Sequence, residues 1–348
     1  MLANKEKMVD WFFSSRIWTG EAYAHCYSMR GKTTNYPEAT AYAISLSCLL
    51  YKEKKEKKFL DRAESCAKYM MSISKKGGVP NLRDNLLYTF DTGIFISGLF
   101  DLYALTRNIE YLSQAKKSLN WLYSLWDGES FCAVSKIAKE TEWYLCQSVH
   151  LTKLAIPLLK ASRYLGEDEH KQTAFKLLEN AKQLQTAEGA FRTHNNSDVI
   201  MTHPHCYATE AFLFAYYATR RYDLLEITRK SSNWLCKIQN ADGSFYRRYD
   251  LDKTSSSCCN KEKTKTSDAT AQATRIWKLL GVNQAGIEKA YHYLNGELKN
   301  GGLRLCRDSS LRSELLSWRR GVWSWPTFFY IHSLMLPFGE IDNSEELF

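Results

Sequence analysis

Two kinds of hydrophobic pattern alternate along the 348-residue chain. The first kind places apolar residues three and four positions apart with polar residues between them, as Phe59, Ala63 and Cys66 do. Such spacing predicts a helix with one buried face and one face in water. Six segments show this pattern, at residues 5–14, 56–74, 109–126, 168–187, 221–239 and 284–296.

Segments of the second kind are apolar or small on nearly every side. Six of them follow Tyr36, Asp91, Gln147, His203, Ser267 and Trp325, at intervals of about 56 residues with one longer gap. A helix that lacks a charged face is buried on all sides. The alternation therefore predicts an all-α fold, an (α/α)6 barrel (toroid) of six helical hairpins, with the second kind of helix inside and the first kind outside.

No linker interrupts this period, so the chain is expected to form a single domain over residues 1–348. The longer gap contains a polar insertion at residues 250–266, which is predicted to be a loop. Two similar stretches, 185–191 (QTAEGAF) and 239–245 (QNADGSF), are predicted to be equivalent connections from an outer helix to an inner helix. Their glycines, Gly189 and Gly243, are expected to end the outer helices in a left-handed conformation.

Composition narrows the functional classes. Apolar residues make up 45% of the chain and charged residues 24%, as in an ordinary globular protein, and the net charge is +9. No basic and aromatic module of a nucleic-acid-binding protein is present, so the charge favours an anionic small ligand or glycan, with no nucleic acid as partner. The start of the chain lacks an apolar leader, and no apolar run approaches the length of a membrane span, which predicts a cytoplasmic protein. The ten cysteines lack metal-binding spacing, so free thiols are expected, with no metal and no cofactor.

Polar residues stand at or near the starts of the inner segments, where a buried helix would not need them. In a closed ring every inner helix begins at the same rim, so these side chains would meet at one opening. They are Glu38, Asp91, His203, His205, Glu210 and Asp268. Asp91 and Asp268 could instead cap their helices, which is worth about 1 kcal/mol, and Glu210 could satisfy a buried Tyr or His. Glu38 lies one turn into its helix and has little capping role, which favours a functional one.

Basic and aromatic residues accompany the same connections. Arginines follow the glycine turns, beside helix N-termini that themselves favour anions. Those arginines could simply remain in solvent, and the aromatic side chains could fill the core. The substrate-binding set that we expect is Tyr36, Arg83, His205, Tyr207, Arg247, Arg304 and Trp325.

Several blocks of the sequence resemble a known superfamily. The Gln-acid-Gly-Phe turns, with "YPEATAY", "FDTGIFISGL", "THPHCYATEAF", "SDATAQATRIW" and "SWPTFFYIHSLML", are similar to six-hairpin (α/α)6 proteins from about Trp11 to Leu336. More closely, they resemble a group labelled prenyltransferase/squalene-oxidase-repeat proteins, which is associated with surface-polysaccharide gene sets. The resemblance implies the fold and a polysaccharide setting. The aspartate-rich motifs of terpene cyclases and the zinc ligands of prenyltransferases are absent from this sequence.

We expect a carbohydrate-active enzyme that acts on an acidic or amino-sugar glycan, with Glu38, Asp91, His203 and Asp268 as the catalytic set. A glycoside hydrolase needs one protonated and one ionised carboxyl group, which Glu38 with Asp91 or Asp268 could supply. A polysaccharide lyase or sugar epimerase would instead use acid–base chemistry by histidine or tyrosine. The candidates for that chemistry are His203, His205, Tyr36 and Tyr207. An isoprenoid cyclase or prenyltransferase-like protein and a non-catalytic glycan-binding scaffold are the remaining alternatives.

Overall fold

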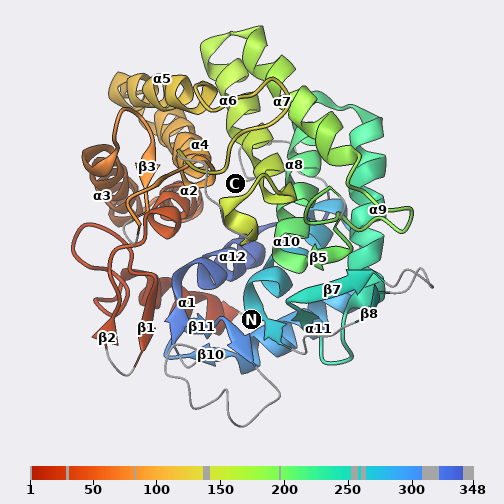
Figure 1. Cartoon of the computed structure of the whole chain (residues 1–348). Coiled ribbons are helices and arrows are strands. Elements are labelled where there is room, and N and C mark those ends of the chain that lie inside the picture. The colour runs from red at the N-terminus through yellow and green to blue at the C-terminus, as the bar shows by residue number, and fades with distance from the viewer. Residues whose placement is uncertain are drawn as a thin grey trace.

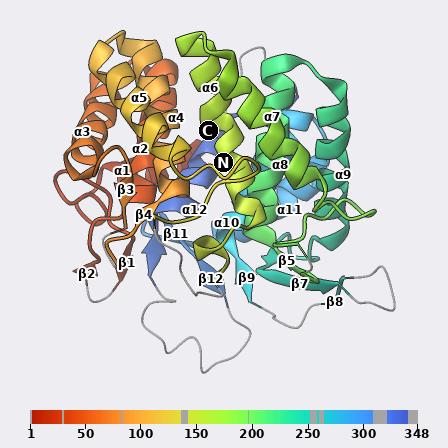
Figure 2. The ribbon, with the colours of Figure 1, turned by 45° about the horizontal axis from the view of Figure 1, so that its top comes forward.

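Helices form two concentric layers in the computed structural model, which describes residues 2–28, 31–81, 84–135, 142–195, 197–251, 258–259, 264–307 and 321–339 (Figures 1 and 2). The inner layer consists of α2 (Pro37–Lys54), α4 (Thr89–Thr106), α6 (Ala155–Leu165), α8 (Thr202–Thr219), α10 (Ser267–Leu280) and α12 (Ser324–Met335). The outer layer consists of α1 (Leu2–Phe13), α3 (Lys57–Ile73), α5 (Ile109–Tyr123), α7 (Asp168–Lys182), α9 (Tyr222–Ile238) and α11 (Gln284–Gly296).

The inner helices contact one another in a closed ring. Helix α2 touches α4, and the contacts continue through α6, α8, α10 and α12 back to α2. The outer helix α1 packs against α12, so the first and last helices of the chain make the sixth pair. Inner helix α4 is buried without interruption from Thr89 to Leu102, whereas outer helix α3 buries only one face. The predicted (α/α)6 barrel of six hairpins is confirmed.

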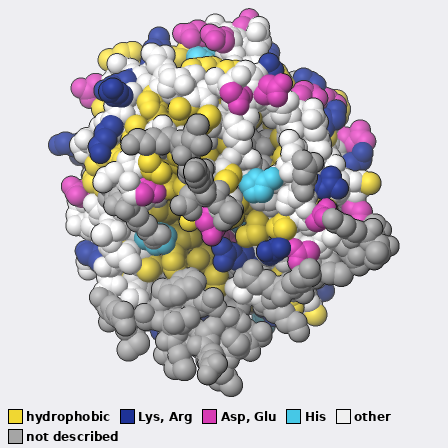
Figure 3. Space-filling model, in the orientation of Figure 1, with side chains coloured by type: hydrophobic (Ala, Val, Ile, Leu, Met, Phe, Trp, Pro, Cys, Tyr) yellow, Lys and Arg dark blue, Asp and Glu magenta, His cyan; other side chains and the backbone are white. Residues whose placement is uncertain are grey.

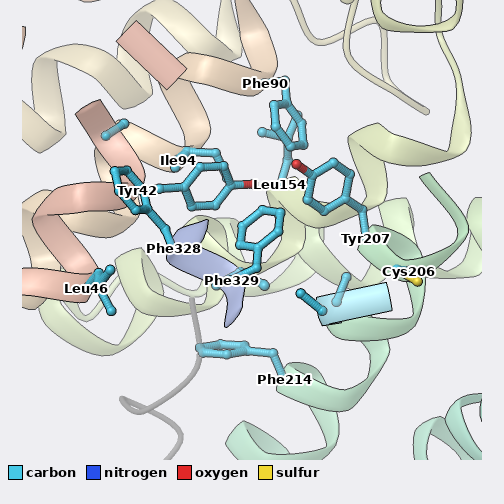
Figure 4. Close-up of a cluster of buried hydrophobic side chains, with 14 of the residues drawn as sticks. Tyr42, Leu46, Phe90, Ile94, Leu154, Cys206, Tyr207, Phe214, Phe328 and Phe329 are labelled. Carbon is cyan, nitrogen blue, oxygen red and sulfur yellow. The ribbon is translucent and has the colours of Figure 1, made fainter. Parts of the chain in front are cut away.

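The apolar core of the ring is continuous. Figure 4 shows side chains from five inner segments meeting near its axis, namely Tyr42, Ile94, Leu154, Phe214 and Phe329. One of these segments is irregular, because residues ahead of α6 form a 3-10 helix, η2 (Val149–Leu154). A Cβ on Gly93 of α4 would lie 2.2 Å from Leu154 Cδ2, so a glycine allows α4 and η2 to approach closely. Among the described residues, no helix has both the length and the apolar character that crossing a membrane requires.

Short strands lie on the connections that lead from outer to inner helices, and therefore at one rim of the ring (Figure 2). They pair into four small sheets, in the orders β10-β11-β13-β1-β2, β12-β9-β6, β3-β4 and β5-β7-β8. The strands of the first sheet are β1 (Cys26–Ser28), β2 (Gly31–Lys32), β10 (Leu298–Lys299), β11 (Gly302–Arg304) and β13 (Val322–Trp323). Those of the second and third are β6 (Phe245–Tyr246), β9 (Lys265–Thr266), β12 (Cys306–Arg307), β3 (Val79–Pro80) and β4 (Leu87–Tyr88).

The fourth sheet lies at the predicted loop of residues 250–266, of which 252–257 and 260–263 are outside the described residues. Its strands are β5 (Val199–Met201), β7 (Arg248–Leu251) and β8 (Cys258–Cys259), and β9 at the end of the insertion pairs with β6 and β12. The described part of the insertion therefore adds strands to this rim.

The repeated glycine turns have a different function from the one expected. Helices α7 and α9 end at Lys182 and Ile238, several residues ahead of Gly189 and Gly243, so these glycines do not end the helices. Both glycines have a positive φ, +100° and +89°, which favours glycine. A Cβ on either would lie 2.1 Å from a backbone carbonyl oxygen of the next outer helix. The glutamine of each repeat also donates to that helix, from Gln185 to Ile227 O at 3.0 Å. The repeat therefore joins each hairpin to its neighbour.

Candidate functional site

A pocket of about 520 Å³ opens at the strand-bearing rim, where the inner helices begin. In Figure 3, apolar side chains surround the middle of this face, and acidic, basic and histidine side chains interrupt them there. The predicted site residues that line the pocket are Tyr36, Glu38, Asp91, His203, Arg247, Asp268 and Trp325. The closed ring thus brings together side chains from five inner helices and two other positions of the rim.

Glu38 is the second residue of α2, directly after Pro37 in its first turn. Its Oε2 accepts a hydrogen bond from the Tyr36 hydroxyl, and its Oε1 accepts one from the Tyr207 hydroxyl at 3.4 Å. Burial raises the pKa of Glu38, while the two hydroxyls and His203 act in the opposite direction. Two phenols therefore fix the orientation of a carboxyl group in the pocket.

Asp91 is buried in the first turn of α4. Burial raises its pKa well above the ordinary range of an aspartate, and the charges of Glu38 and Asp84 raise it further. The capping alternative is wrong for this residue, because the N-cap of α4 is Tyr88 and no side chain caps that helix. A buried acid that favours its neutral form is suited to donating a proton.

Asp268 and His203 form a second polar group of the pocket. Asp268 follows Ser267 in the first turn of α10, whose N-cap is Thr266, so Asp268 is not a cap either. Its Oδ1 accepts a hydrogen bond from the backbone N–H of Ala269 at 2.7 Å, and its Oδ2 lies 3.8 Å from Nδ1 of His203. His203 Nδ1 is 2.6 Å from Oε1 of Gln272.

His205 does not reach the pocket. The ring is fully buried on the other side of α8, where its Nδ1 accepts the backbone N–H of Phe191 at 3.0 Å and its centroid lies 4.6 Å from that of Trp234. Burial lowers the pKa of His205 to about 3. Two residues along a helix correspond to a rotation of about 200°, which turns His205 away when His203 faces the pocket.

Three further residues lie elsewhere. Arg304 is absent from the pocket lining, and its Nε is 2.9 Å from Oε2 of Glu297. Glu210 is buried below the pocket, where it pairs with Lys153 at 2.5 Å and Arg275 at 3.4 Å, so it does not serve a buried Tyr or His as the sequence alternative proposed. Tyr207 is buried and reaches the site through Glu38. Arg83 lies outside the described residues.

Aromatic side chains form one wall of the pocket. The imidazole of His25 packs between Tyr36 and Trp323, with centroid separations of 4.4 Å to each, and lies 5.0 Å from Trp325. Flat faces of this kind stack on sugar rings or other planar groups. The rings of Phe90 and Tyr207, 4.8 Å apart, lie close to each other in Figure 4.

The lining residues that the sequence analysis missed include His25, Asp84, Trp143 and His150. His150 is buried, its Nδ1 is 2.5 Å from Ser148 Oγ, and its Nε2 has no hydrogen-bond partner among the described residues. Burial lowers the pKa of His150 to about 3, so the ring is neutral. Its position near the start of the third inner segment is the signal that could have identified it. Trp143 belongs to a short 3-10 turn, η1 (Trp143–Leu145), that no periodicity marks.

Within the described residues, no group of three or more His, Cys, Asp or Glu side chains is arranged to hold a metal ion.

Known proteins are similar to this chain in structure rather than in sequence. No protein-family model and no curated protein matches it. Cellobiose 2-epimerase from Bacillus thermoamylovorans superposes with a TM-score of 0.77 at 10% identity, covering 96% of this chain and 98% of its own. A sugar epimerase from a ruminal bacterium gives 0.76 at 11% identity, covering 96% and 97%. Unsaturated glucuronyl hydrolase from Bacillus sp. GL1 gives 0.68 at 13% identity, covering 96% and 93%. These similarities show a shared fold, and the closer resemblance to the prenyltransferase-repeat group stays a prediction.

Proposed function

We propose that the protein is a carbohydrate-active enzyme, and specifically a glycoside hydrolase that acts on an acidic or amino-sugar glycan. The observation that carries the proposal is the pairing of Asp91 with Glu38 in one pocket. Both carboxyl groups line the pocket, where burial and then the charge of Glu38 raise the pKa of Asp91. Two carboxyl groups that interact divide into one protonated and one ionised member. Structures of the same fold include proteins named as an epimerase and a hydrolase of saccharides.

In this proposal Asp91 donates its proton to the glycosidic oxygen as the bond to the anomeric carbon breaks. Glu38, held by the hydroxyls of Tyr36 and Tyr207, is the ionised partner. It either attacks the anomeric carbon or removes a proton from the attacking water. Its two hydrogen bonds hold the charge in place before the reaction, which reduces the reorganisation that the transition state requires.

The remaining predicted residues would bind the substrate. Arg247 is the only Lys or Arg side chain among the described residues that line the pocket, and its position at the mouth suits a carboxylate of the glycan. Trp325 and Tyr36, with ring centroids 5.7 Å apart, supply flat faces for a sugar ring. The preference for an anionic glycan depends on Arg247, because the other charged residues of the lining are the acids Glu38, Asp84, Asp91 and Asp268.

Sugar epimerisation or elimination is the second candidate. The observation that favours it is the contact of His203 Nδ1 with an amide oxygen, which leaves the lone pair of a neutral ring on Nε2 as a base. Such a base could remove a proton from a carbon next to a carbonyl or carboxylate group. Two of the structures with the same fold are sugar epimerases.

The test is to incubate the protein with a panel of uronate-containing and amino-sugar oligosaccharides while following three products. Hydrolysis releases reducing ends, elimination adds the ultraviolet absorbance of an unsaturated uronate, and epimerisation incorporates deuterium from heavy water without cleavage. We expect reducing ends from wild type and their loss in Glu38→Gln and Asp91→Asn, with both variants folded by circular dichroism. Glu110→Gln, at an exposed acid of α5, is the matched control and should retain full activity. Reducing-end release that survives both pocket substitutions would contradict the proposal.

A further inference from the structure

Below the pocket, a connected set of buried polar side chains ends on His203. The set consists of Lys153, Arg275, Glu210 and Gln272, from η2, α10, α8 and α10, with exposed fractions of 1%, 2%, 6% and 0%. Burying a polar or charged group costs free energy unless the group is paired, so the presence of these four side chains inside the ring requires an explanation. The hydrolytic pair of carboxyl groups does not use any of them.

The set begins at Glu210, which forms ion pairs with two cations. Lys153 Nζ is 2.5 Å from Glu210 Oε2, and Arg275 Nη1 is 3.4 Å from Glu210 Oε1. As the anion of two ion pairs, the carboxylate has only acceptor oxygens to offer to any further neighbour. That neighbour is Gln272, whose Nε2 donates to Glu210 Oε2 at 3.4 Å.

This contact fixes which way the amide of Gln272 faces. The NH2 group has to face the carboxylate, so the carbonyl oxygen Oε1 faces His203, at 2.6 Å from Nδ1. A carbonyl oxygen only accepts hydrogen bonds, and therefore Nδ1 of His203 has to carry a proton. In the neutral ring the lone pair is then on Nε2. Asp268 Oδ2, 3.8 Å from the same Nδ1, is also an acceptor and favours the same tautomer.

His205 shows the opposite arrangement two residues along the same helix. Its Nδ1 accepts the backbone N–H of Phe191 at 3.0 Å, so that nitrogen carries no proton and the neutral ring is protonated on Nε2. The chain therefore holds two neighbouring histidines in opposite tautomers. The tautomer of the buried imidazole, His205, follows from a backbone contact. The tautomer of the pocket imidazole, His203, follows from side chains that come from another helix.

We infer that Glu210 and Gln272 are positioning residues that hold His203 with its proton on Nδ1, so that Nε2 is offered to the ligand as a proton acceptor. In the hydrolase this acceptor takes a hydrogen bond from a sugar hydroxyl and orients the ring, and in the second candidate reaction it is the base. The inference rests on the proposed function only in taking a saccharide as the ligand of the pocket. The tautomer itself follows from the contacts of the free protein.

The experiment is a long-range proton–nitrogen correlation spectrum of the full chain labelled with ¹⁵N-histidine, recorded above the pH at which the rings are protonated. Signals of His203 and His205 are assigned by their loss in His203→Gln and His205→Gln. We expect a protonated Nδ1 in His203 and a protonated Nε2 in His205. A His203 ring protonated on Nε2 would overturn the inference.

The role of Gln272 is tested in Gln272→Met, which keeps the length of the side chain and removes the acceptor. We expect the His203 signals to change to the other tautomer or to an average of both, while those of His205 stay as in wild type. If that variant does not fold, Glu210→Gln gives the same test, because a neutral amide at 210 no longer fixes the direction of Gln272. His203 signals that stay unchanged in a folded variant contradict the positioning role.

The two proposals fail independently. The tautomer measurement uses no substrate, so inactivity on every oligosaccharide leaves it standing. A His203 tautomer opposite to the one expected leaves the hydrolase standing, since that proposal depends on Asp91 and Glu38.

Discussion

The two rims of the ring differ in how the chain turns. At the rim away from the pocket, α2, α4 and α8 end on Lys55, Arg107 and Arg220, each with φ of 55° to 57°, and the outer helix follows within two residues. At the pocket rim the connections are long, carry the strands, and turn on glycines that contact the next hairpin. Three turns of the far rim therefore accommodate bulky residues in the left-handed conformation. At the pocket rim each connection is constrained by its contact with the next hairpin. These connections are also long enough to place functional side chains.

Helix α4 carries an acid toward each rim, and exchanging each for its amide should separate activity from stability. Asp91→Asn removes the proton donor, so we expect turnover to fall by about 10²–10⁴-fold. Asp101, toward the far end, pairs with Lys160 at 2.5 Å and accepts from Ser45. Asp101→Asn leaves a buried lysine without its anion and should lower the free energy of unfolding by about 3 kcal/mol, with activity retained in the protein that stays folded. Steady-state kinetics and urea unfolding measure the two effects, and similar behaviour of the two variants would contradict the comparison.

Asp91 also predicts how stability depends on pH. Its pKa in the folded protein is raised, so the folded state binds the proton more tightly than the unfolded state. The stability that this provides is complete below the unfolded pKa of about 3.9 and is lost as pH rises toward the folded value. Asp91→Asn should therefore unfold at a higher temperature than wild type at neutral pH. Thermal unfolding at a series of pH values tests this, and a melting temperature of the variant below that of wild type at every pH would count against it.

Two left-handed glycines test the difference between the rims directly. Gly189 at the pocket rim has φ +100° and would place a Cβ 2.1 Å from Lys230 O, whereas Gly166 at the far rim has φ +74° and open space around it. Gly189→Ala adds a collision to the backbone strain and should lower the free energy of unfolding by about 3 kcal/mol or more. Gly166→Ala adds strain alone, about 1 kcal/mol. Denaturant midpoints compare them, and equal losses would mean that the contact with the next hairpin is not important.

The buried histidines predict a loss of stability in acid. Burial lowers the pKa of His205 and of His150 to about 3, so between that pH and an unfolded value of about 6.5 the unfolded state binds more protons. Stability is then full above the unfolded value and falls as the pH is lowered. His205→Gln can still accept the N–H of Phe191 and should show a shallower loss between pH 7 and 4. An unchanged slope in thermal unfolding would show that this ring does not contribute.

The smallest effect is expected at the far rim. Arg107→Gly removes a left-handed side chain, which is worth about 1 kcal/mol, and also removes a cation from a helix C-terminus, which offsets part of that gain. The melting temperature should stay equal or rise slightly, and activity should not change. A clear loss of turnover in this variant would show that the far rim influences the pocket.

The pattern of apolar residues was sufficient to predict the ring. Helices without a charged face have to be covered on every side, and helices with one apolar stripe can cover them, so the alternation left few arrangements. The same reasoning predicted that Glu38, Asp91, His203 and Asp268 begin inner helices and therefore lie at one rim. It could not distinguish His203 from His205, because both stand in the first turn of one helix and only the packing of α9 and α10 selects the face.

The sequence by itself determined the number and order of the hairpins, and the rim at which polar residues gather, because these follow from periodicity and from the direction of the chain. Tertiary structure alone decided which of those residues share the pocket and which are paired elsewhere. Arg304 is held by Glu297, and Gln272 faces His203 only because Glu210, paired with Lys153 and Arg275, turns its amide. Such contacts join residues far apart in the chain, and periodicity has no information about distances between helices that are not neighbours in sequence.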